Sequence, residues 1–170
     1  MSPFARILRH LIYPDWWYWR RINTATMGRV ERAIADSEAR HTGEIRVVIE
    51  TSLSWPSLLS RQVARERALD VFSLHRVWDT AANNGVLIYL LLADRDVEII
   101  ADRGVAGVVD PAAWEAICLA MEEKFAKGEY EAGLLHGVRE VGRHLHIHFP
   151  CDESSGQENI NELPDHPVRL

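Results

Sequence analysis

The sequence predicts an α/β fold: a small mixed β-sheet, in which a parallel β-α-β unit precedes an antiparallel hairpin, with helices on both faces. Two segments, Glu44 to Thr51 and Gly85 to Ala93, have the apolar pattern of strands, and a helical segment separates them. A third strand-like run, Val97 to Ala101, follows the second after a short polar turn. The helical connection predicts that the first two strands are parallel with a right-handed crossover, and the short turn makes the third antiparallel to the second.

The first half of the chain contains two amphipathic helical patterns. Met27, Val30 and Ile34 recur at helical spacing, which predicts a helix over about Thr26 to Arg40, ended near Gly43. We expect a loop at Ser54 to Ser57, around Pro56, and a second helix from about Leu58 to Arg76. The polar residues Asp79 to Asn84 are expected to form a loop before the second strand.

The second half contains two further helices. Asp110 and Pro111 are typical of a helix N-terminus, and Gly128 of a helix end. The apolar face of this third helix comprises Trp114, Ile117, Cys118, Met121 and Phe125. The fourth helix is stopped before Pro150 and has an apolar face of Leu134, Val138, Val141 and Leu145.

The chain of 170 residues suits one domain with a distinct segment at each end. Residues 1–21 are basic and aromatic, with four arginines against one aspartate and with Trp16, Trp17, Tyr18 and Trp19 in succession. Residues 22–150 form the predicted α/β domain. Residues 151–170 are acidic and contain Pro164 and Pro167, so this tail is predicted to be disordered.

Composition excludes several classes of protein. A formal net charge of -6 argues against nucleic-acid binding as the main role. The two cysteines do not form a disulfide framework, and no apolar stretch reaches the roughly 20 residues of a membrane span. Arginines interrupt the N-terminal segment, so it lacks a signal-peptide core. We therefore predict a cytoplasmic protein that is either free or peripheral to the membrane.

Polar residues lie at one predicted end of the sheet. Glu44 and Asn84 mark the starts of two parallel strands, and Asp102 follows the antiparallel third strand. Carboxylate and amide oxygens are the ligands that hard cations such as calcium prefer. Glu44, Asn84 and Asp102 therefore form a candidate metal site. The alternative is structural: Asn84 shapes a turn and Asp102 pairs with Arg103.

Three other motifs have a stronger structural interpretation. Asp94-Arg95-Asp96-Val97 resembles the nucleophile motif of haloacid-dehalogenase-type phosphatases, but aspartate is also favoured in a hairpin turn. His144 and His148 have the i, i+4 spacing of metal ligands, yet histidine is also favoured at a helix C-terminus. The aromatic N-terminal segment suits a membrane interface or a partner, or it packs against the domain itself.

Several short motifs resemble the TPM-domain family over about Ala33 to Pro150. They are Gly43 to Glu50, Ala64 to Ala68 with Phe72, Trp78 to Thr80, Asn84 to Ile88, Ile99 to Gly104, and Gly128 to Tyr130 with Gly133. The resemblance implies a compact α/β domain, binding of calcium or another divalent cation, and in some members acid phosphatase activity. Many members carry a signal peptide and a transmembrane tail, and this sequence has neither pattern.

Two functional hypotheses follow. In the first, the domain binds a divalent cation at Glu44, Asn84 and Asp102, and hydrolyses a phosphate ester with Asp102 and Arg103 as catalytic groups. In the second, the protein is a non-catalytic interaction module that docks on a membrane or a protein partner through its aromatic N-terminal segment.

Overall fold

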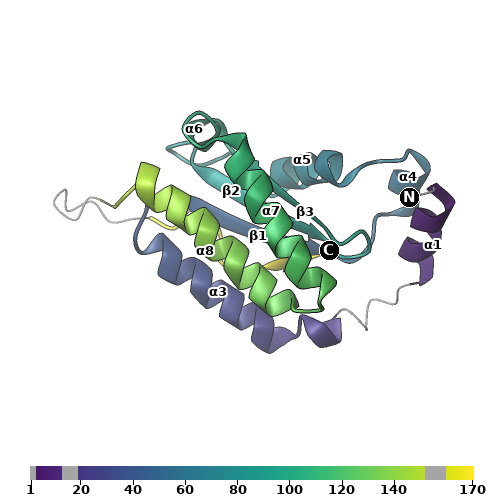
Figure 1. The fold of residues 1–170 in the computed structure, drawn as a ribbon. Coiled ribbons are helices and arrows are strands. Elements are labelled where there is room, and N and C mark those ends of the chain that lie inside the picture. The colour runs from purple at the N-terminus through teal and green to yellow at the C-terminus, as the bar shows by residue number, and fades with distance from the viewer. Residues whose placement is uncertain (1–2, 13–18, 152–159) are drawn as a thin grey trace.

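The computed structural model describes residues 3–12, 19–151 and 160–170, and it confirms the predicted mixed sheet. The strands are β1 (Glu44–Glu50), β2 (Gly85–Leu91), β3 (Asp96–Ala101) and β4 (Val168–Arg169), in the order β3-β2-β1-β4. β1 and β2 are parallel, and β2 and β3 form the antiparallel hairpin. Figure 1 shows this sheet at the centre of the molecule, enclosed by helices.

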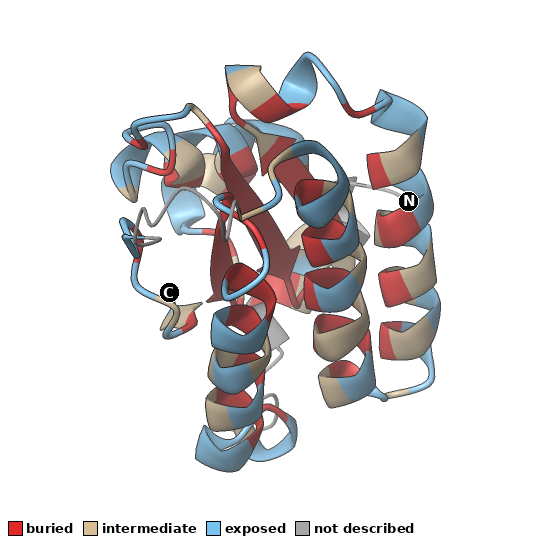
Figure 2. Cartoon of the chain, turned by 90° about the vertical axis from the view of Figure 1, so that its left-hand side faces the viewer, coloured by how far each residue is buried: buried red, intermediate tan, exposed pale blue. Residues whose placement is uncertain are grey.

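Helices cover both faces of the sheet. One face packs against α3 (Thr24–Glu38), α7 (Pro111–Ala126) and α8 (Tyr130–His148), and the other against α4 (Trp55–Leu59) and α5 (Ala64–Leu74). Two further helices are α1 (Pro3–Ile12) and the short α6 (Arg103–Ala106), which follows β3 directly. Figure 2 shows buried residues concentrated in the sheet and on the helix sides that face it.

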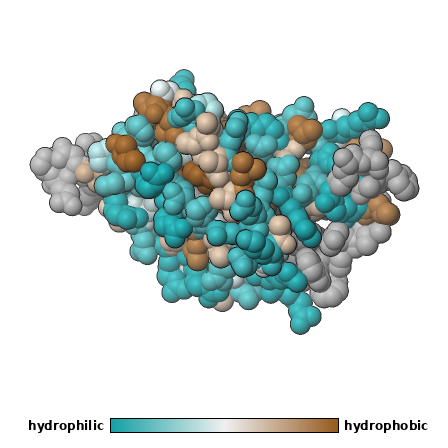
Figure 3. Space-filling view, in the orientation of Figure 1, coloured by the Kyte–Doolittle hydropathy of each residue, from teal (hydrophilic) through white to brown (hydrophobic). Residues whose placement is uncertain are grey.

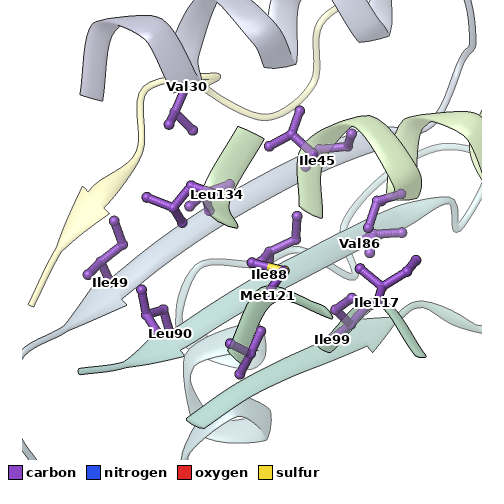
Figure 4. Close-up of a cluster of buried hydrophobic side chains, with 14 of the residues drawn as sticks. Val30, Ile45, Ile49, Val86, Ile88, Leu90, Ile99, Ile117, Met121 and Leu134 are labelled. Carbon is purple, nitrogen blue, oxygen red and sulfur yellow. The ribbon is translucent and has the colours of Figure 1, made fainter. Parts of the chain in front are cut away.

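Strand alternation divides the core into two clusters. The side chains of β1 and β2 that contact α3, α7 and α8 alternate with those that contact α5. The first cluster is the larger because three helices contribute to it (Figure 4). Its labelled members are Val30, Ile45, Ile49, Val86, Ile88, Leu90, Ile99, Ile117, Met121 and Leu134.

The predicted helix ends are confirmed where a side chain caps the backbone. The Asp110 carboxylate accepts a hydrogen bond from the Ala112 amide at 2.9 Å, with Pro111 in the first turn of α7. Gly128 follows α7 with a φ of +82°, a left-handed conformation that glycine adopts without strain. These local signals are why α7 begins where the sequence predicts.

The region from Ser54 to Arg76 differs from the prediction. The expected loop at Ser54 to Ser57 contains the start of α4, whose N-cap is Ser54. The expected single helix is divided into α4 and α5, because Arg61 has a φ of +60° and interrupts the right-handed helix.

The prediction of a disordered tail is wrong for residues 160–170. This segment packs along the outer edge of β1, where Val168 and Arg169 pair in parallel with Val48 and Ile49. Figure 4 shows β4 as the pale yellow arrow beside β1. The pairing depends on contacts with residues more than 100 positions away, which no local sequence pattern reports.

Candidate functional site

The three predicted metal ligands lie at one end of the sheet. Glu44, the first residue of β1, pairs with Gly85, the first residue of β2. The Asp102 amide donates to the Gly85 carbonyl oxygen at 2.9 Å, and Asn84 immediately precedes Gly85. The sequence-based placement of Glu44, Asn84 and Asp102 at one end is therefore confirmed.

The backbone of Val77 covers Gly85, which lies between Glu44 and Asp102 at this end of the sheet. A Cβ atom at Gly85 would overlap the carbonyl oxygen of Val77. The strand register puts the side chains of Glu44 and Asp102 on the same face of the sheet as that Cβ position. The Val77 carbonyl therefore lies over β2, between Glu44 on one side and Asp102 on the other. Only glycine at position 85 leaves room for this oxygen.

The carboxylate of Glu44 is bound by the C-terminal segment. Glu44 is buried, and its Oε2 accepts a hydrogen bond from the Leu163 amide at 3.1 Å. Burial raises the pKa of Glu44, and the backbone donors of Glu162 and Leu163 partly offset this effect. Glu44 is therefore engaged in holding residues 160–170 to the domain.

The Asn84 side chain turns away from Glu44. Its amide nitrogen donates to the Thr42 carbonyl at 2.6 Å, and its backbone amide donates to the Thr80 hydroxyl at 3.0 Å. Strand alternation directs Asn84 to the face opposite Glu44. The Asn84 Oδ1 atom is buried and has no hydrogen-bond partner within the described part of the chain.

Asp102 caps the short helix α6. Its Oδ1 accepts from the Arg103 amide at 2.7 Å, whereas its Oδ2 is buried and without a partner among the described residues. The Arg103 guanidinium does not contact Asp102; it donates to the Asn83 side-chain oxygen at 2.8 Å and is exposed. Asp102 thus keeps one carboxylate oxygen free for a further interaction.

Backbone oxygens lie close to Gly104, two residues after Asp102. A Cβ atom at Gly104 would be 2.6 Å from the Asn83 carbonyl oxygen and 2.9 Å from that of Ala82. Within residues 3–12, 19–151 and 160–170, however, no group of three or more His, Cys, Asp or Glu side chains is arranged to hold a metal ion. Any cation here would need amide and backbone oxygens besides Asp102.

The sequence profile of the TPM domain matches residues 20–144. The chain belongs to the TPM domain family. A similar solved structure is the BA42 protein of the psychrophilic bacterium Bizionia argentinensis, with a TM-score of 0.74, 29% identity, and coverage of 87% of this chain and 94% of that one. A second is the N-terminal domain of a P. gingivalis protein, with a TM-score of 0.56, 25% identity, and coverage of 77% and 82%. No curated protein matches this sequence.

The matched range separates the TPM domain from its terminal additions. Glu44, Asn84 and Asp102 lie inside residues 20–144, whereas α1 and residues 160–170 lie outside. Both additions nevertheless pack on the TPM domain, because Ile7 and Leu163 contact the core cluster on the α5 face. The protein is therefore a TPM domain that carries a described segment at each terminus.

The Asp94–Asp96 motif lies at the opposite end of the β2–β3 hairpin, in and beside its turn. Residues 92–95 form this turn. Two side chains of α1 contact the Asp94 carboxylate: the Arg6 guanidinium lies 2.8 Å and the His10 Nε2 atom 3.2 Å from its oxygens. Burial alone would raise the pKa of Asp94, but the hydrogen bonds from His10 and Arg6 outweigh it and lower the pKa. These contacts favour the interpretation of Asp94 as a docking point for α1.

Sequence reasoning missed an acidic pocket of about 590 Å³ along the exposed edge of β3, between α5 and α7. Burial, together with the carboxylates of Glu98 and Glu122, raises the pKa of Asp96 to about 6. Burial also raises the pKa of the Cys118 thiol to about 12, so this thiol stays protonated at neutral pH. The sequence signal that could have indicated this pocket is the alternation of the acidic residues Asp96 and Glu98 along an edge strand.

The histidines of α8 contact other groups. His146 Nδ1 lies 2.8 Å from the Arg40 carbonyl oxygen, and the His144 ring meets the Trp114 ring edge-on with centroids 5.4 Å apart. No third metal-ligating side chain joins His144 and His148 in the described regions. These contacts favour the structural interpretation of the histidine run.

The aromatic N-terminal segment is only partly described, and Trp16, Trp17 and Tyr18 lie outside the described residues. Trp19 is half-buried, with the Arg169 guanidinium 4.5 Å from its ring centroid. No helix in the described part of the chain has the length and apolar character to cross a bilayer. The face formed by α3, α7 and α8 is mainly hydrophilic, with hydrophobic groups over α6 and the start of α7 (Figure 3).

Proposed function

We propose that this TPM domain binds a divalent cation at the start of β2, with Asp102 as its principal side-chain ligand. The observation that supports the proposal is the Asp102 Oδ2 atom, a buried carboxylate oxygen that has no donor among the described residues. A buried polar atom without a partner costs about 1–3 kcal/mol, and more when it carries charge. A cation that coordinates this oxygen would remove that cost.

The chemistry of the surrounding atoms fits a hard cation. Carboxylate, amide and backbone carbonyl oxygens are typical calcium ligands, and calcium tolerates irregular geometry better than magnesium does. The carbonyls of Ala82 and Asn83 approach Gly104, two residues after Asp102. Glu44 joins the ligand set only when its bond to the Leu163 amide is released.

The proposal extends to phosphate esters as ligands. Arg103 is exposed, next to Asp102, and its guanidinium is suited to bidentate binding of phosphate. A bound cation would supply Lewis-acid stabilisation of charge on phosphate oxygens. Hydrolysis of a phosphomonoester is therefore the reaction that we propose for this end of the domain.

Thermal unfolding with calcium, magnesium and manganese tests the cation site. At a concentration of 100 times Kd, a ligand that binds only the folded state stabilises it by about 2.7 kcal/mol. For a chain of this size, that raises Tm by about 5–10 °C. We expect this shift in the wild type and its loss in Asp102→Asn, because the amide lacks the charge that binds the cation.

Asp110→Asn is the matched control. Asp110 is also a helix N-cap, and asparagine is an equally good cap, so both substitutions preserve capping. Asp110→Asn should keep the full metal-dependent shift. If wild type and Asp102→Asn respond equally to every cation, Asp102 is not a ligand.

Hydrolysis of p-nitrophenyl phosphate separates binding from catalysis. We expect metal-dependent turnover that falls in both Asp102→Asn and Arg103→Gln, whereas Asp110→Asn retains it. A metal-dependent Tm shift without turnover would leave the cation site in place and remove the phosphatase proposal.

A further inference from the structure

Residues 160–170 contact the TPM domain as an extended segment bound along one strand edge. Glu44, Arg46, Val48 and Ile49 form the receiving surface, which we call the β1-edge site. All four lie inside the family range 20–144, whereas the bound segment lies outside it. Eight residues, 152–159, connect the segment to the rest of the chain.

The β1-edge site binds mainly the backbone of the segment. Arg46 donates to the carbonyl oxygens of Pro164 and His166, the second at 3.0 Å. The Leu170 amide donates to the Ile49 carbonyl at 2.9 Å, next to the two paired residues of β4. Main-chain hydrogen bonds of this kind hold an extended peptide at a sheet edge.

Side chains of the segment add specific anchors. Leu163 is only 7% exposed and enters the core cluster on the α5 face. Arg169 donates to the Ile22 carbonyl at 3.0 Å and stacks over Trp19. The Glu162 carboxylate accepts from the Ala81 amide at 3.0 Å. By contrast, Ile160 is 73% exposed, so it makes a natural control position.

The sequence of the segment favours a bound extended conformation. Pro164 and Pro167 fix their own φ near the extended range and lack amide donors. Each also disfavours helix at the residue before it, so the segment loses less conformational entropy on binding than a flexible peptide would. The proline carbonyl stays available, and Arg46 binds that of Pro164.

The segment leaves a space between itself and α3. A pocket of about 620 Å³ separates it from α3 and is lined by Thr24 and Met27 on the domain and by Pro167 and Val168 on the segment. The segment is therefore held along one strand edge without being enclosed by the core, as a bound peptide is.

We propose that the β1-edge site is a peptide-binding site whose ligand, the C-terminal segment 160–170, is separable from the domain and can be supplied by a second copy of this chain. The contacts between the segment and the domain are hydrogen bonds, strand pairing and side-chain packing. A short connector gives an effective concentration of about millimolar, so the chain's own segment occupies the site in dilute solution. Exchange between copies is then favoured where the protein is concentrated.

The test uses the full chain with a protease recognition sequence introduced between residues 152 and 159. After cleavage, a fluorescently labelled peptide with the sequence of residues 160–170 stands for the segment of a second copy. We expect saturable binding by fluorescence anisotropy, and competition by the unlabelled peptide.

Variant peptides make the test specific without altering the fold of the domain. The Leu163→Ala peptide should bind at least tenfold more weakly, because it lacks the buried anchor, whereas Ile160→Ala should bind within about twofold of the wild-type sequence. An Arg46→Gln domain, with folding confirmed by circular dichroism, should also bind the wild-type peptide at least tenfold more weakly.

Three results would overturn the proposal. One is the absence of saturable binding to a cleaved chain that keeps its circular dichroism spectrum. Another is equal binding of the Leu163→Ala and wild-type peptides. The third is unfolding of the chain on cleavage, which would make the segment an integral strand of the fold.

Discussion

Glu38 makes the stability of the protein depend on pH. It is the last residue of α3 and is buried, and its Oε1 accepts from the Ile45 amide at 2.7 Å. Burial, helped by the carboxylates of Glu44 and Asp165, raises the pKa of Glu38 to about 9 despite that hydrogen bond. The substitution Glu38→Gln removes the titration and keeps an oxygen for the Ile45 amide.

The sign and size of the effect follow from proton linkage. Between the unfolded pKa near 4.5 and the folded pKa near 9, the folded protein holds a proton that the unfolded chain releases. Stability therefore falls as pH rises through this window, by at most about 1.4 kcal/mol per pH unit. From pH 7 to 8.5 the loss is at most about 2 kcal/mol, or about 4–8 °C in Tm.

The other groups whose pKa values shift most act outside that interval. Burial lowers the pKa of His41 to about 4, so its contribution to stability rises with pH but is complete near pH 7. Asp96, with a pKa raised to about 6, loses its contribution to stability as pH rises toward 6, which is below that interval. Cys118, raised from 9 to about 12, loses its contribution mainly above pH 9. The interval from pH 7 to 8.5 therefore reports chiefly on Glu38.

Thermal unfolding followed by circular dichroism at constant ionic strength measures this slope. We expect Tm of the wild type to fall between pH 7 and 8.5 and Tm of Glu38→Gln to stay nearly constant. Glu123→Gln, at an exposed position of α7, should keep the wild-type slope. A Glu38→Gln protein with the wild-type slope, or a wild type whose Tm rises with pH, would refute a protonated Glu38.

Two further predictions concern the sheet end and α1. Gly85→Ala should cost more than about 3 kcal/mol in urea denaturation, because its Cβ would overlap the Val77 carbonyl; Gly28→Ala, with nothing within 4 Å, should stabilise by about 0.5–1 kcal/mol. Asp94→Asn should speed amide hydrogen exchange in α1 but not in β2, because it removes the charge that holds Arg6. Stronger co-sedimentation of Asp94→Asn than of wild type with anionic vesicles would support membrane docking by the N-terminal segment, and equal co-sedimentation would count against it.

The parts of the fold that the sequence predicted are those with local signals. Strand alternation, the Asp110 cap and the glycine after α7 each act within a few residues, so β1, β2, β3, α3, α7 and α8 were predictable. The segment 160–170 has no such signal. Its proline and acidic residues suggest disorder, whereas its binding depends on Glu44 and Arg46 in a distant strand. Arg61 likewise has no sequence signature for its left-handed conformation.

The candidate site was predictable in position but not in detail. Strand direction alone brings Glu44, Asn84 and Asp102 to one end of the sheet. Which oxygens are free there depends on tertiary structure: the Leu163 amide and the α6 backbone donate to two of the carboxylates, and the Thr42 carbonyl accepts from the Asn84 side-chain amide. The Leu163 amide binds Glu44, while Asn84 and Asp102 each keep an oxygen without a donor in the described chain.

The two ends of the β2–β3 hairpin differ in how their carboxylates are compensated. Asp94 is paired by Arg6 and contacted by His10, both from outside the family range. Asp102 receives one backbone amide, and its second oxygen has no partner among the described residues. Because a buried anionic oxygen is costly unless it is paired, the Asp102 end is the one that an added positive charge would stabilise. A divalent cation there would do for Asp102 what α1 does for Asp94, and this difference, rather than the similarity of Asp94–Asp96 to a catalytic motif, distinguishes the two ends.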